Sequence, residues 1–148
     1  MKIYLDICVY NRPFDDQAQP RIMVESLCFI ILMAKVSYGD FQTVNSFALE
    51  YENTKNPKLE NRKIIMDLLH EASEFVAKND ALVARSKDLE KSGVMAMDAL
   101  HVACAESACA DYFVTCDDTL IKKLHRIESV KMNVITLMDF MSKEVFKS

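Results

Sequence analysis

Short β-prone stretches alternate with longer helical stretches along this chain of 148 residues. The strand candidates are residues 2–5, 41–44, 112–115 and 133–135. Strands that alternate with helices predict a parallel sheet packed between helices, because each parallel connection needs a crossover. We therefore expect an α/β fold. The length and the lack of internal repeats predict one domain over residues 1–148.

The helical stretches have their own start and stop signals. Pro20 opens a helix that should run to about Lys35, and its apolar residues leave so little polar surface that we expect it to be largely buried. Asn45 or Ser46 can cap the next helix, which should end near Asn56. Further helices are predicted over residues 58–78, 80–93, 95–110, 119–126 and 138–146, and residues 11–20 are expected to form a polar loop.

The composition excludes several classes of protein. Hydrophobic residues make up 51% and charged residues 27% of the chain, which is typical of a globular protein. Gly39 and Gly93 are the only two glycines, so glycine-rich phosphate loops are excluded. The net charge of −4 argues against nucleic-acid binding by bulk electrostatics, but an enzyme with clustered acids remains open.

The cysteines and the apolar runs indicate a cytoplasmic protein. The five cysteines are odd in number and form no CxxC pair, so we expect neither disulfides nor a zinc site. The longest apolar run, residues 27–34, is far shorter than the roughly 20 residues of a membrane span. The first residues do not resemble a secretory signal.

Acidic residues occur where open α/β sheets place their chemistry. Asp6 ends the first strand candidate, and Asp117 follows the third by two residues. Because parallel strands end at the same edge, both carboxylates can meet there. For Asp6, a residue that only caps a turn is the competing interpretation.

Asp98 lies in the apolar stretch 95–110, where a buried carboxylate needs a cation, hydrogen bonds or a raised pKa. A purely structural pairing, for example with protonated His101, is the alternative. Glu50 and Glu52 follow the second strand candidate and face roughly opposite ways on a helix, so at most one can join a shared site. Carboxylate-rich sites suit Mg²⁺ or Mn²⁺. Two such ions about 3.5–4 Å apart can support phosphodiester cleavage.

Four segments in this order resemble the PIN domain, a family that includes metal-dependent ribonucleases and VapC-type toxins. The segments are YLDICVYN, SFALEYE, MDALHVA and YFVTCDD. The resemblance spans residues 2 to about 135. It implies a three-layer α/β/α fold with a central parallel sheet of four or five strands.

The resemblance also implies roles for individual residues. The catalytic and metal-binding acids fall on Asp6, Glu52, Asp98 and Asp117, with Glu50 as the alternative to Glu52. Thr115 and Asn11 would support the site, and Asp118 would cap the following helix. His101 would pack beside the acids. Basic residues that could hold the RNA backbone are Arg12, Lys55, Lys58, Arg62 and Lys63.

The implied function is that of a Mg²⁺- or Mn²⁺-dependent endoribonuclease, the toxin of a toxin–antitoxin pair. RNA would be its substrate, a small antitoxin its partner, and a second copy would form a homodimer through apolar helices. Ile7 departs from the family's usual Thr or Ser, so an inactive PIN-like module that binds RNA or a protein is the alternative. Receiver and phosphatase folds fit poorly, because Cys8 stands where a phosphatase needs its second Asp.

Overall fold

The computed structural model describes residues 1–147, and its centre is one five-stranded sheet in which every strand pairing is parallel. The strand order across the sheet is β3-β2-β1-β4-β5. The strands are β1 (Lys2–Leu5), β2 (Gln42–Ser46), β3 (Glu74–Val76), β4 (Tyr112–Thr115) and β5 (Asn133–Thr136). This is the α/β architecture expected from the sequence.

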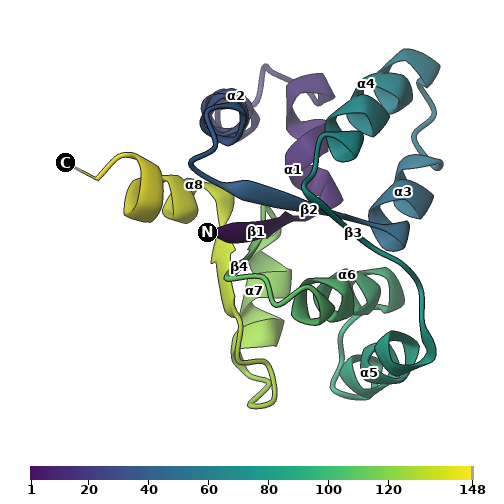
Figure 1. Cartoon of the computed structure of the whole chain (residues 1–148). Coiled ribbons are helices and arrows are strands. Elements are labelled where there is room, and N and C mark those ends of the chain that lie inside the picture. The colour runs from purple at the N-terminus through teal and green to yellow at the C-terminus, as the bar shows by residue number, and fades with distance from the viewer. Residues whose placement is uncertain (148) are drawn as a thin grey trace.

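Helices cover both faces of the sheet. Those between β1 and β3 are α1 (Ile7–Asn11), η1 (Arg12–Phe14), α2 (Pro20–Ser37), α3 (Phe47–Asn53) and α4 (Leu59–His70). Those after β3 are α5 (Asp80–Lys91), α6 (Ala96–Ser107), α7 (Asp118–His125), α8 (Leu137–Phe140) and the π-helical turn η2 (Met141–Val145). In Figure 1, α1, α2 and α4 lie above the sheet and α5, α6 and α7 below it.

Local sequence signals set several helix boundaries. The Ser46 hydroxyl caps α3 by accepting from the backbone N–H of Leu49, at 3.1 Å. Asn79 caps α5 in the same way, through the N–H of Leu82. Gly39 and Gly93 follow α2 and α5 with φ angles of +87° and +100°, a conformation that glycine adopts at little cost.

The order of the strands creates a topological switch point at one edge of the sheet. From β1 the chain proceeds outward to β2 and β3, and it then returns to place β4 on the other side of β1. The carboxyl ends of β1 and β4 therefore flank the point where the winding direction changes. Open α/β sheets bind their ligands at such a point.

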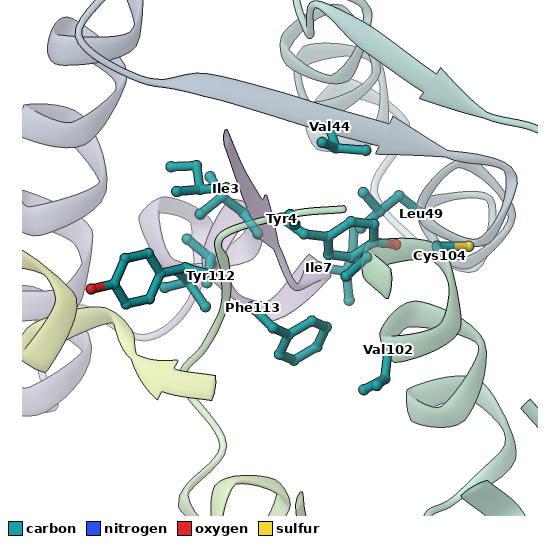
Figure 2. Packing of buried hydrophobic residues seen from close by; sticks show 14 of the residues in the cluster. Ile3, Tyr4, Ile7, Val44, Leu49, Val102, Cys104, Tyr112 and Phe113 are labelled. Carbon is teal, nitrogen blue, oxygen red and sulfur yellow. The ribbon is translucent and has the colours of Figure 1, made fainter. Parts of the chain in front are cut away.

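Two aromatic residues pack in the core next to this switch point. Tyr4 of β1 and Phe113 of β4 stack with ring centroids 5.7 Å apart, and both are completely buried. Figure 2 shows Tyr4 among the buried side chains of the sheet and of α6, including Val102 and Cys104. The strand ends that carry the acidic residues are thus held by dense packing.

Three sequence-based expectations were wrong in detail. Residues 74–76, expected in a long helix, form edge strand β3 beside β2, because pairing with β2 outweighs their helical spacing. Residues 7–14, partly expected as loop, form α1 and η1. Helix α2 is not largely buried: its exposed apolar residues are Met23, Val24, Leu27, Ile30 and Ile31.

Within residues 1–147, no helix combines the length and the apolar character needed to cross a lipid bilayer.

Candidate metal centre

Asp6 lies at the junction of β1 and α1, and each of its two carboxylate oxygens accepts a hydrogen bond. One oxygen accepts from the backbone N–H of Ile7 at 2.8 Å, which makes Asp6 the N-cap of α1. The other accepts from the Thr115 hydroxyl at 2.8 Å and faces the Cys8 thiol at 3.5 Å. Asp6 therefore does act as a cap, and its second, buried oxygen faces the end of β4 through Thr115.

Glu52 reaches the same place from α3. Its Oε1 lies 2.6 Å from Nε2 of His101, and that nitrogen lies 4.0 Å from Oδ1 of Asp6. Because an ionised carboxylate only accepts, Nε2 of His101 is the donor in this contact. One atom from each of these three residues lies within 4.8 Å of the others. These residues bring together the end of strand β1, helix α3 and helix α6.

His101 is completely buried and bonded at both ring nitrogens. Its Nδ1 lies 2.8 Å from the Tyr4 hydroxyl, which in turn lies 2.7 Å from the Ser46 hydroxyl. Burial alone would lower the pKa of His101, but the hydrogen bond to Glu52 and the charges of Asp6 and Asp98 outweigh it and raise that pKa. A chain of hydrogen bonds therefore fixes Glu52 against the core.

Glu50 points elsewhere. Its Oε2 accepts from the Asn45 amide at 2.6 Å and lies 3.4 Å from His70. Glu50 and Glu52 are two residues apart on α3, so they project to different sides of the helix. Of the two acids left open by the sequence, Glu52 is the one brought next to Asp6.

Asp98 lies in the first turn of α6, on the same face as His101 one turn later. Burial, followed by the charge of Asp6, raises the pKa of Asp98 to about 6, and Asp117 and Glu52 add to this effect. Among residues 1–147, Asp98 makes no hydrogen bond or ion pair, so the structural pairing with His101 is not formed. Its carboxylate is the member of the group that most needs a cation.

Asp117 is exposed at the end of β4 and is the N-cap of α7. Its Oδ1 accepts from the N–H groups of Thr119 and Leu120, at 2.9 and 3.1 Å. The expectation that Asp118 caps this helix was wrong, because Asp118 forms a two-pronged ion pair with Arg21 instead. Among residues 1–147 the other oxygen of Asp117 makes no hydrogen bond, and the charge of Asp117 contributes to the raised pKa of Asp98.

A buried glutamate of α2 forms ion pairs with two arginines near this edge of the sheet. Glu25 of α2 is only 1% exposed and pairs with Arg12 at 2.9 Å and with Arg21 at 3.3 Å. Arg21 also donates to the Cys116 carbonyl oxygen at 3.1 Å, next to Asp117. Arg12, which was expected to hold substrate, pairs with Glu25 through Nε and with Asp15 through Nη1.

Three of the remaining candidate residues line a pocket of about 440 Å³ beside Glu52. Asn11, Lys55 and Lys58 line it together with Ile7, the residue that follows Asp6. Arg62 donates to the Thr54 carbonyl oxygen outside the pocket, and Lys63 is exposed on α4.

Sequence reasoning placed His101 only beside the acids, whereas the structure puts it between two of them. The spacing of three residues between Asp98 and His101 is a usable signal, since such residues share a helix face. No sequence pattern indicated that Tyr4 and Ser46 support the site. Tyr4 contacts both His101 and Ser46, and these contacts join segments far apart in the chain.

The donor set fits a divalent cation. Asp6 and Glu52 supply carboxylate oxygens, Asp98 adds a carboxylate that is unpaired among residues 1–147, and His101 holds Glu52 in place through its Nε2–H. A positive ion would relieve the repulsion between these carboxylates, which contributes to the raised pKa of Asp98. Oxygen-rich sites suit Mg²⁺ or Mn²⁺.

No protein-family model matches the sequence, and no curated protein matches it. Two solved structures have the same fold. One is FitAcB from Neisseria gonorrhoeae, with 12% identity and a TM-score of 0.55. The other is VapBC2 from Rickettsia felis bound to a DNA fragment from their promoter, with 20% identity and a TM-score of 0.55. Each alignment covers 92% of this chain and 98% of the other. The fold is thus PIN-like: a five-stranded parallel sheet in a three-layer α/β/α arrangement.

Proposed function

We propose that this chain is a Mg²⁺- or Mn²⁺-dependent endoribonuclease and that residues 1–148 act as one PIN-like domain. The observation that carries the proposal is the convergence of Asp6, Glu52 and His101 within 4.8 Å at the carboxyl edge of the sheet. The raised pKa of Asp98, caused by burial and by the charge of Asp6, supports it, because a bound cation would stabilise the ionised carboxylate.

In this proposal Asp6, Glu52, Asp98 and Asp117 hold the metal. A bound divalent ion would supply Lewis-acid polarisation of water and of the phosphodiester. Thr115 keeps the Asp6 carboxylate turned toward β4 through its 2.8 Å hydrogen bond. His101 orients Glu52 through Nε2 and is itself held by the Tyr4 hydroxyl at Nδ1, so it is a positioning residue. Lys55 would hold a phosphate at the pocket rim.

We further propose that the enzyme is the toxin of a toxin–antitoxin pair and works in the cytoplasm, where thiols stay reduced. The sequence resemblance to VapC-type toxins and the fold shared with VapBC2 support this role. An antitoxin would cover the acidic edge. A second copy of the chain would dock on the exposed apolar face of α2, where Leu27 and Ile30 are 55% and 58% exposed.

The experiment is cleavage of a mixed RNA pool by the purified chain with Mn²⁺ or Mg²⁺. EDTA and an Asp6→Asn/Asp98→Asn variant serve as controls. Metal-dependent cutting that both controls abolish supports the proposal. Cutting that persists in EDTA, or in the variant, contradicts it. A single-stranded DNA pool run in parallel determines whether RNA is the preferred substrate.

One observation favours the alternative, an inactive PIN-like module that binds RNA or a protein. Ile7 is 8% exposed and lines the pocket beside Glu52, so no hydroxyl is available at this position to contact phosphate or water. Metal binding without cutting would favour this alternative. An Ile7→Thr variant restores the hydroxyl, and a cleavage rate that appears only in this variant would identify Ile7 as the cause.

A further inference from the structure

One arginine of α2 holds the residues on both sides of Asp117. Arg21 forms a two-pronged pair with the Asp118 carboxylate, at 2.7 and 3.0 Å, and donates to the Cys116 carbonyl oxygen at 3.1 Å. These two residues directly follow and precede Asp117 in the chain. Helices α2 and α7 lie on opposite faces of the sheet (Figure 1), so Arg21 connects two layers of the fold at the end of β4.

The contact with Cys116 fixes the peptide plane that leads into Asp117. The carbonyl oxygen of Cys116 and the N–H of Asp117 belong to one planar peptide group. Arg21 donates to this oxygen, and the N–H donates to the Thr115 hydroxyl oxygen at 3.2 Å. The same hydroxyl donates to the Asp6 carboxylate at 2.8 Å. Both edges of this peptide group are thus held, one by α2 and the other by the residue that contacts Asp6.

A buried acid holds Arg21 itself in this position. Glu25 lies one turn later on α2, is 1% exposed and accepts from Nε of Arg21 at 3.3 Å. The guanidinium therefore uses Nε for Glu25, Nη1 for Asp118, and Nη2 for both Asp118 and Cys116. A lysine cannot reproduce this planar set of contacts, because its ammonium group is a compact charge. The pair with Asp118 is exposed to water, so we expect it to affect the geometry of the turn more than global stability.

We propose that Arg21 is a positioning residue for Asp117: it fixes the turn between β4 and α7, and thereby the direction in which the Asp117 carboxylate faces the metal. The inference rests on the proposed function, in which Asp117 is a metal ligand. Oδ1 of Asp117 accepts from the N–H groups of Thr119 and Leu120, so the carboxylate follows the orientation of the turn. Groups that hold a metal ligand in place tune the affinity of its site.

The charge of Arg21 and its contacts act on metal binding in opposite directions. A cation near the site repels a metal ion, so removal of the charge alone would tighten Mn²⁺ binding. Removal of the contacts that orient Asp117 would weaken Mn²⁺ binding. The direction of the change in Mn²⁺ affinity therefore separates a positioning role from a purely electrostatic one.

The first test is Mn²⁺ titration of the full chain and of Arg21→Met, which removes the guanidinium. We expect binding about tenfold weaker, the lower end for such a group because the Arg21 side chain is 44% exposed. Arg21→Lys should also weaken binding, since it keeps the charge without the planar contacts. Arg85→Met is the matched control, because Arg85 forms a similar two-pronged pair with Glu106, and it should bind Mn²⁺ like the unchanged protein. Unchanged or tighter binding in Arg21→Met would overturn the inference.

A double-mutant cycle tests whether the effect acts through Asp117. In an Asp117→Asn background, Arg21→Met should cause no further loss of Mn²⁺ affinity, because the ligand that Arg21 positions is already impaired. Circular dichroism establishes that each variant is folded, and Arg21→Lys replaces Arg21→Met in the cycle if the latter is not. An equal loss in both backgrounds would overturn the inference, since Arg21 would then act independently of Asp117.

Amide hydrogen exchange of the metal-free chain tests the turn without any metal. The capped N–H groups of Thr119 and Leu120 should exchange about three- to tenfold faster in Arg21→Met, the equivalent of one weakened hydrogen bond. The Leu82 N–H, capped at the start of α5, should not change. Unchanged exchange at Thr119 and Leu120 would overturn the inference. Faster exchange in Arg21→Met, in a chain that binds no Mn²⁺ when unchanged, would reject the metal centre and retain Arg21 as the residue that fixes the turn.

Discussion

Oε1 of Glu52 lies 2.6 Å from Nε2 of His101, a buried imidazole whose other nitrogen contacts the Tyr4 hydroxyl at 2.8 Å. This relationship links an acid at the protein surface to the aromatic core beneath the sheet. It also accounts for the choice between the two glutamates of α3. Glu52 is fixed toward Asp6, and Glu50 is fixed toward Asn45.

Replacing Glu52 by Gln should weaken Mn²⁺ binding at least about tenfold, because the charge next to Asp6 is lost while the side-chain shape is retained. Glu50→Gln on the same helix is the matched control and should bind Mn²⁺ like the unchanged protein. Isothermal titration with Mn²⁺ measures both. Equal losses of Mn²⁺ affinity in the two variants would show that Glu52 is not a specific metal ligand.

The pKa of Asp98 predicts how stability depends on pH in the absence of metal. Burial and the charge of Asp6 raise this pKa from 3.8 to about 6, so the folded state holds its proton more tightly than the unfolded state. This contribution to stability is complete below pH 4 and is lost as the pH rises through about 6. Allowing for screening by solvent, we expect a loss of about 1–2 kcal/mol.

Urea unfolding in EDTA at pH 5 and pH 8 tests this expectation. Asp98→Asn should gain stability relative to the unchanged protein as the pH rises. Asp67→Asn, an exposed residue of α4, should show no such trend. A difference between Asp98→Asn and the unchanged protein that does not vary with pH would contradict the raised pKa.

Glu25 should be one of the most sensitive charged residues for stability. Glu25→Gln removes the buried charge that pairs with Arg12 and Arg21. We expect a loss of about 3 kcal/mol, the lower end for a broken buried pair, because both arginines keep some contact with water. Urea unfolding measures the loss, and Glu60→Gln at the exposed start of α4 is the control. A loss no larger than that of the control would rule out a structural role.

Much of the fold could be predicted from the sequence, and the reasons are local. The strands β1 and β4 are short apolar runs bounded by turn residues, and Ser46 is a strong cap residue. Strand β3 was missed because its three residues continue a helical pattern and become a strand only by pairing with β2. Asp118 was taken as a cap because Arg21, its actual partner, lies 97 residues away.

Part of the candidate site could also be predicted from the sequence. Asp6 and Asp98 were identified by their surroundings in the sequence, one at a strand end and one in an apolar helix. The position of His101 between the acids and the commitment of Arg12 to Glu25 depend on long-range packing. No local pattern of residues carries such information.

The exposed face of α2 predicts a dimer. The double variant Leu27→Glu/Ile30→Glu places charges on this face, and light scattering should show that it is monomeric while the unchanged protein is dimeric. Ile64→Glu changes another exposed apolar residue, on α4, and should remain dimeric. A monomeric unchanged protein, or a dimer that survives the double substitution, would contradict the docking of a second copy on α2.

Manganese titration of the purified chain, compared with the Asp6→Asn/Asp98→Asn variant, tests the metal centre most directly. We expect saturable binding to the unchanged protein and a loss of at least about tenfold in the variant, which lacks two of the converging charges. Circular dichroism establishes that both proteins are folded. Negligible binding to both, or the same affinity in both, would contradict a metal site built on Asp6 and Asp98.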